Sequence, residues 1–486
     1  MSDESPERLN LIDGEWVEAS TGETVTTRNP ADTREVVATY QQSGSADAER
    51  AVEAAAAAAD EWAATPGPER GAVLRDAAKR LDDRREELTE LLTREEGKTL
   101  AEAAPEVGRA VDIFYYYAER AMDFGGRNPE AGGRRRDVYT VKEPLGVAGL
   151  VTPWNYPIAI PAWKLGPALA TGNTVVLKPA SIAPGVALEV AEALHEAGAP
   201  AGVLNVVTGP GSEVGDVVTG HEDVDAVSFT GSGEVGYHVY DAATEDMKRV
   251  QAEMGGKNPT VVSASADVDE AVSVVGAGAF GVTGQACTAA SRAIVHESVA
   301  DEFVEGIVAH AESLTVGDGL EGADMGPQVS ESELEGTLRY VDLAADEGAT
   351  LATGGDRLEG GTHEHGHFVE PTVFTDVESD MRIAQEEVFG PVLAVITVSD
   401  FDEAMRVAND VDYGLSSSIV TDDHTEANRF ADEIEAGVAK INEKTTGLEL
   451  HVPFGGYKRS STNTYREQGE AGMEFFTSTK TVYRNY

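Results

Sequence analysis

The sequence contains very little cysteine: Cys287 is the only one among 486 residues. A single cysteine excludes an internal disulfide and any zinc site built from paired thiolates. Long apolar runs are also missing, since no segment approaches the roughly 20 residues that a membrane helix needs. Residues 1–5 lack the basic and apolar regions of an export signal. We therefore expect a cytoplasmic protein that does not insert into a membrane.

Basic residues are scarce as well: 37 lysines and arginines stand against 86 acidic residues, for a formal net charge of −49. Nucleic acid is therefore not an expected partner, because its phosphates would be repelled almost everywhere. The 41% hydrophobic content and the periodic segments exclude an acidic disordered protein. We interpret the charge as an adaptation to a salt-rich cytoplasm, since salt screens the self-repulsion of a compact acidic chain.

Two regions of the sequence alternate β-rich and helical segments. In the first, strands are predicted at 147–152, 174–178, 203–207, 226–230 and 249–253, with helices at 158–170, 185–197 and 211–219. In the second, strands are predicted at 260–263, 293–296, 350–353, 392–398 and 416–420, with helices at 267–283, 299–313, 331–347, 400–409 and 424–435. Such alternation predicts an α/β protein with two parallel sheets, each covered by helices on both faces. Upstream helices are expected at 47–63, 69–95 and 109–123.

Cys287 stands in the run GQACT at 284–288. A free cysteine is more often a buried apolar filler than a nucleophile. Here Gly284 and the polar Gln285 suit a backbone that passes close to a bound molecule better than a packed helix interior. Glu253, 34 positions upstream, is a candidate base for such a thiol. The pattern favours a nucleophilic cysteine.

The run GSGEVG at 231–236 is a literal G-x-G-x-x-G between a predicted strand and a predicted helix. A dinucleotide-binding fingerprint also requires an acidic residue about 20 positions further on, which binds the adenosine ribose. Glu253 lies 22 residues after Gly231 and has that spacing. The spacing leaves two interpretations open: Glu253 binds the ribose, or it is the base that serves Cys287.

Three histidines, His363, His365 and His367, would share one face of a strand and so have the spacing of metal ligands. The glycines that flank them indicate a loop instead. We expect no metal site.

Seven runs resemble motifs of the aldehyde dehydrogenase superfamily, in the family's order and over essentially the whole chain. They are TPWNYP at 152–157, KPAS at 178–181, FTGS at 229–232, EMGGK at 253–257, GQAC at 284–287, EEVFGP at 386–391 and PFGG at 453–456. Each motif alone is moderately specific, but seven in order make coincidence negligible. The resemblance implies a fold of two doubly wound parallel-sheet domains with a small bridging β element for oligomerisation.

The resemblance implies that Cys287, Glu253 and Asn155 form the catalytic set. In this family the cysteine attacks the aldehyde carbon, and hydride transfer leaves a thioester. Asn155 and the backbone N–H of Cys287 would stabilise the developing oxyanion, an effect of roughly 3–4 kcal/mol per donor. The glutamate before Met-Gly-Gly is the family's general base, so Glu253 would activate water and would not bind the ribose.

A nicotinamide cofactor is also implied by the resemblance. The residues expected to bind it are Trp154, Lys178, Ser181, Gly231, Ser232, Gly236, Glu387 and Phe389. Relatives that prefer NAD often carry glutamate at the position of Ser181, where it binds both ribose hydroxyls and repels a 2′-phosphate. Because Ser181 removes that charge and Lys178 adds a cation, we expect NADP to be preferred and NAD to be used more weakly.

The domain layout follows from the same resemblance. It implies a cofactor-binding domain at 1–125 and 145–256, a catalytic domain at 257–440, and oligomerisation strands at 126–144 and 470–486. Edge strands without a partner in their own chain would be a liability, so we expect them to pair with another subunit. The expected assembly is a homodimer that pairs again into a tetramer.

The C-terminal runs at 442–456, 466–469 and 474–477 are similar to 2-oxoglutarate semialdehyde (2,5-dioxopentanoate) dehydrogenases of pentose and sugar-acid breakdown. Succinate semialdehyde dehydrogenases usually carry arginine where this chain has Trp163, and that arginine would pair with the substrate carboxylate. Lys444 and Thr445 are the nearest candidates for such a role here. We expect 2-oxoglutarate semialdehyde as substrate, with succinate semialdehyde, betaine-type and general aliphatic aldehydes as alternatives.

Two other functions are compatible with the same fold. One is a non-catalytic structural protein like the lens crystallins that resemble this family, and the joint presence of Asn155, Glu253 and Cys287 counts against it. The other is a CoA-acylating enzyme, in which thiolysis replaces hydrolysis. The presence of Glu253 favours hydrolysis.

We predict that folding and activity require molar salt. The charge of −49 is screened over ~10 Å at 0.1 M salt but over ~2 Å at 2 M KCl. The midpoint of thermal unfolding and the rate of aldehyde oxidation should therefore both be higher at 2 M than at 0.1 M KCl. An enzyme equally stable at the two concentrations would contradict this interpretation of the charge.

Overall fold

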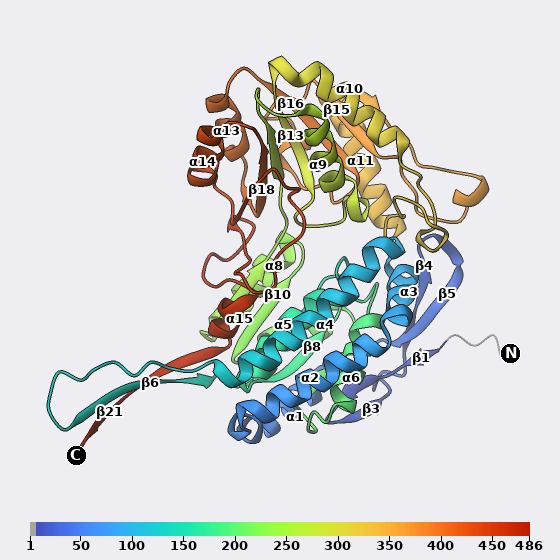
Figure 1. Cartoon of the computed structure of the whole chain (residues 1–486). Helices are drawn as coiled ribbons and strands as arrows, with labels where there is room; N and C mark the ends of the chain where they lie inside the picture. The colour runs from blue at the N-terminus through green and yellow to red at the C-terminus, as the bar shows by residue number, and fades with distance from the viewer. Residues whose placement is uncertain (1–5) are drawn as a thin grey trace.

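The computed structural model describes residues 6–486 and contains two seven-stranded sheets and a two-stranded arm (Figure 1). The first sheet has the order β11-β10-β7-β8-β9-β2-β3 and is parallel from β11 to β9. Its strands are β2 (Asn10–Ile12), β3 (Glu15–Val17), β7 (Val147–Val151), β8 (Thr174–Lys178), β9 (Leu204–Val206), β10 (Ala226–Thr230) and β11 (Arg249–Glu253). The five strands predicted in this region are confirmed, whereas the antiparallel edge formed by β2 and β3 was not predicted.

Apolar side chains on both faces make the first sheet a central layer. Ala148 and Leu150 pack on one face, in a core with α2 (Gly67–Asp83), α4 (Leu100–Asp123), α5 (Ala159–Thr171) and α6 (Gly185–Glu196). Val147 and Val227 pack on the other, in a core with α1 (Ser45–Ala64), α7 (Asp216–Gly220) and α8 (Gly233–Glu245). Successive side chains of a strand point to opposite faces, so strands that are apolar throughout are covered on both sides.

The second sheet has the order β14-β15-β16-β13-β12-β18-β19. Its strands are β12 (Asn258–Val262), β13 (Ala290–His296), β14 (Thr350–Thr353), β15 (Thr372–Thr375), β16 (Val392–Val398), β18 (Ser416–Val420) and β19 (Val438–Ile441). One face packs on α9 (Val268–Ala279) and α10 (Glu297–Ser313); the other packs on α11 (Glu331–Glu347), α12 (Arg382–Gln385), α13 (Phe401–Asn409) and α14 (His424–Glu433). The prediction of a purely parallel sheet was wrong at one edge, because β14 pairs antiparallel with β15. Neither β15 nor β19 was predicted.

Some predicted elements have different limits, and others were missed. The helix predicted at 69–95 is two helices, α2 and α3 (Arg85–Glu96), separated at Arg84. The helix predicted at 109–123 is the C-terminal part of α4, and the one at 211–219 begins with a π-helical turn at Gly211–Gly215. The missed strands are β1 (Glu7–Arg8), β4 (Thr24–Asn29) and β5 (Asp32–Gln41), which form a small sheet, and the pair β17 (Tyr413–Gly414) and β20 (Tyr457–Lys458).

The two-stranded arm consists of β6 (Arg136–Pro144) and β21 (Thr477–Asn485), which pair antiparallel along their whole length. It projects from the body of the molecule and carries the C-terminus (Figure 1). The prediction that these strands lack a partner in their own chain was therefore wrong. The range 470–486 is also not all strand, because it includes most of α15 (Gly469–Phe475). Within the described chain, no further strand pairs with either outer edge of the arm, although the backbone N–H of Thr140 donates to the carbonyl oxygen of Arg127.

The carboxyl ends of the parallel strands determine where the predicted site residues lie. β7, β8, β10 and β11 run in the same direction, so the loops that follow them meet at one edge of the first sheet. The chain then passes from the first sheet to the second in four residues, since β11 ends at Glu253 and β12 begins at Asn258. Across residues 6–486, no helix is both long and apolar enough to span a membrane.

Candidate active site

A cavity of about 190 Å³ lies where the loops of the first sheet meet those of the second. Its walls come from the loop after β7, the turn between β10 and α8, the β11–β12 link, the loop before β13 and the loop before β16. Many of the predicted site residues line it: Trp154, Asn155, Gly231, Ser232, Cys287, Glu387 and Phe389. It is completed by Pro153, Thr230, Met254, Gly255 and Glu333, which were not predicted as site residues.

Cys287 lies partly exposed in this cavity, on a loop with an unusual backbone. Val282, Thr283 and Gly284 all have positive φ, of 52°, 55° and 66°. A Cβ at Gly284 would lie 2.1 Å from the carbonyl oxygen of Gly390, so that position accepts only glycine. The conformation of the loop that carries Cys287 is therefore imposed by its contact with the segment just before β16 of the second sheet. Helix propensity does not determine it.

The thiol of Cys287 is surrounded by apolar atoms and carboxylates. Burial raises its pKa, and the negative charges of Glu387 and Glu253 raise it further. The carbonyl oxygen of Cys287 accepts a hydrogen bond of 2.8 Å from the side chain of Asn258. Asn258 in turn accepts a bond of 2.9 Å from the backbone N–H of Ser416. The cysteine backbone is thus anchored to the second sheet while its side chain faces the cavity.

Asn155 is almost fully buried and reaches the same cavity from the first sheet. Its side-chain amide donates to the carbonyl oxygen of Gln285 at 2.9 Å. Its own backbone carbonyl accepts a bond of 2.7 Å from the ammonium of Lys98. An amide group has two N–H donors, so one remains for a ligand beside Cys287.

Glu253 ends β11 and is buried beside the segment that follows Phe454. One carboxylate oxygen accepts a bond of 3.0 Å from the backbone N–H of Gly456, and the other has no partner in the described chain. Burial raises the pKa of Glu253, and the neighbouring charge of Glu467 adds to the effect. Glu467 itself forms a buried ion pair with Lys164. Glu253 does not line the cavity that holds Gly231, although its charge reaches Cys287.

The position of the Glu387 carboxylate depends on two glycines of the β11–β12 link. It accepts a bond of 3.0 Å from the backbone N–H of Gly256, and a Cβ on Gly255 would lie 1.9 Å from its carboxylate. Burial raises the pKa of Glu387 to about 7. Phe389 has a positive φ of 58°, which directs its ring onto Trp154 in an edge-to-face contact of 5.4 Å between centroids. These aromatic rings form one wall of the cavity.

The glycine-rich turn between β10 and α8 borders the same cavity. Ser232 is the N-cap residue of α8 and makes no capping bond with its side chain. Gly231 packs against its own strand, since a Cβ there would lie 2.6 Å from the ring of Phe229. Gly236 does not line the cavity: a Cβ there would lie 2.5 Å from the sulfur of Met254, so glycine is needed for α8 to pack on β11.

Lys178 and Ser181 lie at the end of β8, outside the cavity that contains Cys287. Lys178 is buried and bonds only to the carbonyl oxygen of Pro179, at 3.0 Å. Burial without a counter-ion lowers the pKa of Lys178 to about 8. The hydroxyl of Ser181 donates to the carbonyl oxygen of Gly209 at 2.8 Å. Among residues 6–486, Lys178 is therefore a buried cation with no anionic partner.

Neither Lys444 nor Thr445 lines the cavity that contains Cys287. Lys444 is exposed and lines a separate cavity of about 710 Å³ beside β19, together with Glu443 and Glu449. The side chain of Thr445 is fully buried, and a Cβ on Gly278 would lie 3.4 Å from its hydroxyl. The structure therefore offers no support for their predicted contact with a substrate.

The three histidines lie in a loop around a short 3-10 turn (Gly361–His363), as their flanking glycines indicated. His363 bonds to the carbonyl oxygen of Val316 at 2.9 Å, and His367 to the carboxylate of Glu331 at 2.9 Å. Within residues 6–486, no three His, Cys, Asp or Glu side chains are grouped as metal ligands.

Comparison with known proteins identifies the family. The model of the aldehyde dehydrogenase family matches residues 16–482. The chain belongs to the aldehyde dehydrogenase family. The sequence-based assignment of enzyme class is confirmed, and with it the α/β fold.

Similar proteins cover nearly the whole chain. An α-ketoglutarate semialdehyde dehydrogenase of Haloferax volcanii is 65% identical, over 98% of this chain and 99% of that protein. A 2,5-dioxopentanoate dehydrogenase of Saccharolobus solfataricus is 43% identical, over 97% and 98%. Among solved structures, betaine aldehyde dehydrogenase of Staphylococcus aureus in complex with NAD+ is 38% identical, with a TM-score of 0.95 over 98% of this chain and 94% of that one.

The residues around the cavity suit a nicotinamide dinucleotide. In the part of the chain that the structure describes, the hydroxyl of Thr230 is buried without a partner, and a Cβ at Gly233, in the first turn of α8, would meet nothing within 4 Å. A helix N-terminus with open backbone beside it suits a pyrophosphate, and the Lys178 ammonium, which donates to Pro179, has N–H groups left for a ribose. Glu387 accepts from one neighbour and has oxygens left for a second ribose.

Several residues around the site were missed from the sequence: Lys98, Glu102, Glu106, Asn258 and Glu467. In a chain with 86 acidic residues, a glutamate on a charged helix is indistinguishable from a solvated one. Lys98 could have been noticed in the sequence as a candidate for an ion pair, because lysine is scarce in this chain and this one follows two glutamates and a glycine. Only tertiary contacts show that these groups are buried.

We predict that Glu387→Gln accelerates alkylation of Cys287 by iodoacetamide at pH 8. The substitution removes a negative charge that raises the thiol pKa, so more thiolate forms. We expect at least a threefold increase, since one unit of pKa changes the thiolate fraction about tenfold. Mass spectrometry of the protein without cofactor measures the rate, because no other thiol is present. The matched control is Glu386→Gln, whose carboxylate bonds to Arg382 and Tyr340; an unchanged rate in Glu387→Gln would refute the electrostatic role.

Proposed function

We propose that this enzyme oxidises 2-oxoglutarate semialdehyde to 2-oxoglutarate, with NADP preferred over NAD, in the breakdown of pentoses and sugar acids. The observation that carries the reaction is the meeting of Cys287 and Asn155 in one cavity, with the charge of Glu253 within reach of the thiol. The substrate is supported by the names of the relatives that are 65% and 43% identical along nearly the whole chain.

The proposed reaction begins with attack of the Cys287 thiolate on the aldehyde carbon. The free N–H of the Asn155 amide and the backbone N–H of Cys287 stabilise the oxygen that becomes negative. The cofactor, when bound, supplies the acceptor for hydride. Glu253 then takes a proton from water, which hydrolyses the thioester and releases the carboxylate. The unpartnered oxygen of Glu253 is the atom available for this water.

The position of Glu253 also supports its role as base over the alternative of ribose binding. Its carboxylate accepts from Gly456 and lies beside Glu467, and it does not line the cavity that contains Ser232, although its backbone carbonyl oxygen accepts from the N–H of Gly231. A raised pKa is the property that a general base working near neutral pH requires. Lys178 is the residue at the end of β8 that we propose for the adenosine ribose.

The preference for NADP rests on Ser181 and Lys178. Ser181 places no negative charge beside Lys178, and its hydroxyl oxygen is still able to accept a hydrogen bond. The Lys178 ammonium has no ionic partner in the described chain. A 2′-phosphate would supply that partner.

The substrate carboxylate needs a cationic partner, and Arg109 of α4 is a better candidate than Lys444. It is partly buried, forms no ion pair in the described chain, and donates to the Gln468 side chain at 2.8 Å. Gln468 adjoins Glu467, whose negative charge helps to raise the pKa of Glu253. A guanidinium has donors left for a planar carboxylate after such contacts.

For the arm we propose pairing between subunits. Within the described chain no further strand pairs with the outer edge of β6 or of β21, and strand edges of this length favour addition of another strand. A dimer that pairs again into a tetramer through these strands is the proposed assembly. The proposed domain boundaries are 1–125 with 145–256, 257–440, and the arm segments at 126–144 and 470–486.

We predict that Cys287→Ala abolishes aldehyde oxidation, because no second thiol is present to replace it. Glu253→Gln should retain a single burst of reduced cofactor but lose steady-state turnover, since acylation proceeds and deacylation does not. Because burial raises the pKa of Glu253, wild-type turnover should fall as the pH is lowered through that raised value. Stopped-flow absorbance at high salt measures both phases, and substantial turnover by Cys287→Ala would rule out the covalent mechanism.

We predict that 2,5-dioxopentanoate gives the highest kcat/KM among four aldehydes, the others being succinate semialdehyde, betaine aldehyde and hexanal. Each is assayed with NADP and with NAD, and NADP should give the higher value. Arg109→Gln should raise KM for the two substrates that carry a carboxylate, by about tenfold for loss of a charged hydrogen bond. Hexanal is the internal control, and its KM should not change.

The outcomes separate the parts of this proposal. A clear advantage for another aldehyde would discard the substrate and leave the enzyme class intact. Equal or better kcat/KM with NAD would discard the cofactor preference alone. A rise in KM for hexanal as well as for the carboxylates in Arg109→Gln would mean that Arg109 only supports the loop that it contacts.

A further inference from the structure

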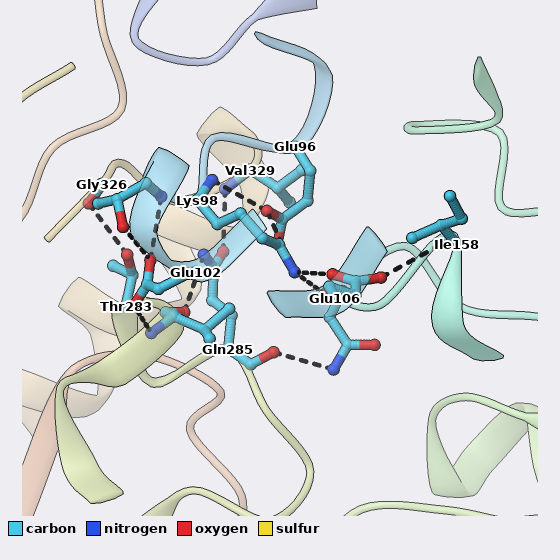
Figure 2. Close-up of polar contacts among 12 residues, drawn as sticks. Glu96, Lys98, Glu102, Glu106, Ile158, Thr283, Gln285, Gly326 and Val329 are labelled. Carbon is cyan, nitrogen blue, oxygen red and sulfur yellow. Dashed lines mark hydrogen bonds and ion pairs between the residues drawn. The ribbon is translucent and has the colours of Figure 1, made fainter. Parts of the chain in front are cut away.

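The N-terminal part of α4 and the segment before it carry a buried charged network that leads to the active site (Figure 2). The Lys98 ammonium is fully buried and bonds to Glu106 at 2.6 Å and to the carbonyl oxygen of Asn155 at 2.7 Å. The other oxygen of Glu106 accepts from the backbone N–H groups of Ile158 and Ala159, each at 3.2 Å. These are free donors at the start of α5, where a negative charge is favourable. These contacts thus hold the backbone of Asn155 and the backbone at the start of α5.

Glu102 extends this network to the nucleophile loop. One of its oxygens accepts from the backbone N–H and the hydroxyl of Thr99, both at 3.0 Å, and closes a capping box at the start of α4. The other oxygen accepts from the backbone N–H of Val282 at 2.6 Å. Val282 is 180 residues away in the sequence and five residues before Cys287. One carboxylate therefore joins the helix α4 to the loop that carries the nucleophile.

The nucleophile loop needs such external support. Val282 and Thr283 are β-branched residues with positive φ, a conformation that persists only where surrounding contacts impose it. The Thr283 hydroxyl donates to Gly326 O at 3.0 Å, and the Gln285 side chain accepts from Val329 N at 2.9 Å. Both of these contacts are between neutral groups. The contact with Glu102 is charge-assisted, and such bonds are about twice as strong as neutral ones.

The contacts of Lys98 and those of Glu102 meet at one hydrogen bond across the active site. Lys98 holds the backbone of Asn155, and Glu102 holds the loop that contains Gln285. The Asn155 amide donates to the carbonyl oxygen of Gln285 at 2.9 Å and joins the two. The distance between Asn155 and Cys287 therefore depends on Lys98, which precedes α4, and on Glu102 in the first turn of α4.

We propose that Glu102 is a positioning residue for catalysis, which keeps the nucleophile loop in its strained conformation and in register with Asn155. Glu102 does not line the cavity and touches neither substrate nor cofactor. Without it, the loop would relax, and the two N–H donors for the oxyanion would no longer converge on one point. The inference rests on the proposed roles of Cys287 and Asn155.

Glu102→Ala tests this, because it removes the bond to Val282. Displacement of a reacting group by about 1 Å costs up to 100-fold in rate, so we expect kcat to fall roughly 10- to 100-fold with KM for the cofactor unchanged. Two measurements without substrate report on the loop itself. Amide hydrogen exchange in a peptide covering 281–289 should accelerate at least tenfold, and alkylation of Cys287 by iodoacetamide at pH 8 should change at least threefold.

Two variants separate positioning from loss of the helix cap. Thr99→Ala weakens the capping box but leaves the bond from Glu102 to Val282, so it should keep wild-type kcat and wild-type exchange at 281–289. Glu102→Gln retains an acceptor without the charge and should lie between the wild type and Glu102→Ala. If Glu102→Ala does not fold, Glu102→Gln carries the test with the same readouts.

The inference is overturned if wild-type kcat and wild-type exchange at 281–289 persist without the Glu102 carboxylate. It is also overturned if Thr99→Ala loses as much activity as Glu102→Ala, since the cap alone would then account for the effect. Failure of the proposed function is a separate result: the wild type would not oxidise aldehydes, while the exchange and alkylation data would still decide whether Glu102 holds the loop.

Discussion

The close approach of the backbone at 254–257 to its neighbours is the constraint on which the site depends. In these four residues the chain leaves the first sheet and enters the second. A Cβ at Gly255 would collide with Glu387, and one at Gly256 would lie 2.7 Å from the carbonyl oxygen of Cys287. The two consecutive glycines therefore let this link pack directly against the loop that carries Cys287 and against the carboxylate of Glu387. Because Glu253 immediately precedes this link, its position relative to Cys287 follows from the same packing.

Electrostatics distinguishes an acidic exterior from an interior whose buried charges are only in part paired, since Lys178 and Lys257 form no ion pair within residues 6–486. The surface carries most of a net charge of −49, which salt screens but contacts do not neutralise. Inside, two lysines of a lysine-poor chain, Lys98 and Lys164, are paired with glutamates and flank the active site from the segment before α4 and from α5. The carboxylates Glu253 and Glu387 instead receive single backbone N–H donors, and burial raises both pKa values. The same environment raises the pKa of Cys287, so the site as it stands favours the neutral thiol.

The two sheets were predictable because buried parallel strands are short, apolar and spaced by helices. The strands at 174–178, 226–230 and 249–253 have the limits that the pattern indicated. The errors fall where pairing depends on distant residues. β14 has the composition of any edge strand, and its antiparallel direction is set by β15, which lies 19 residues beyond it and was not recognised. The arm strands were recognised as strands, but their mutual pairing across more than 330 residues has no local signal.

For the active site, the sequence by itself determined the candidate residues: one cysteine, a glutamate that precedes the run Met-Gly-Gly, and an asparagine in a contiguous motif. These residues can be recognised without a structure because each motif is contiguous in the sequence, so the backbone itself fixes the spacing of its residues. The tertiary structure alone decided how the motifs are held together. Glu102 and Lys98 belong to no motif, yet they bridge α4 to Val282 and Asn155. Whether a glutamate on a helix is solvated or buried against a loop 180 residues away depends on long-range packing, and local sequence carries no record of it.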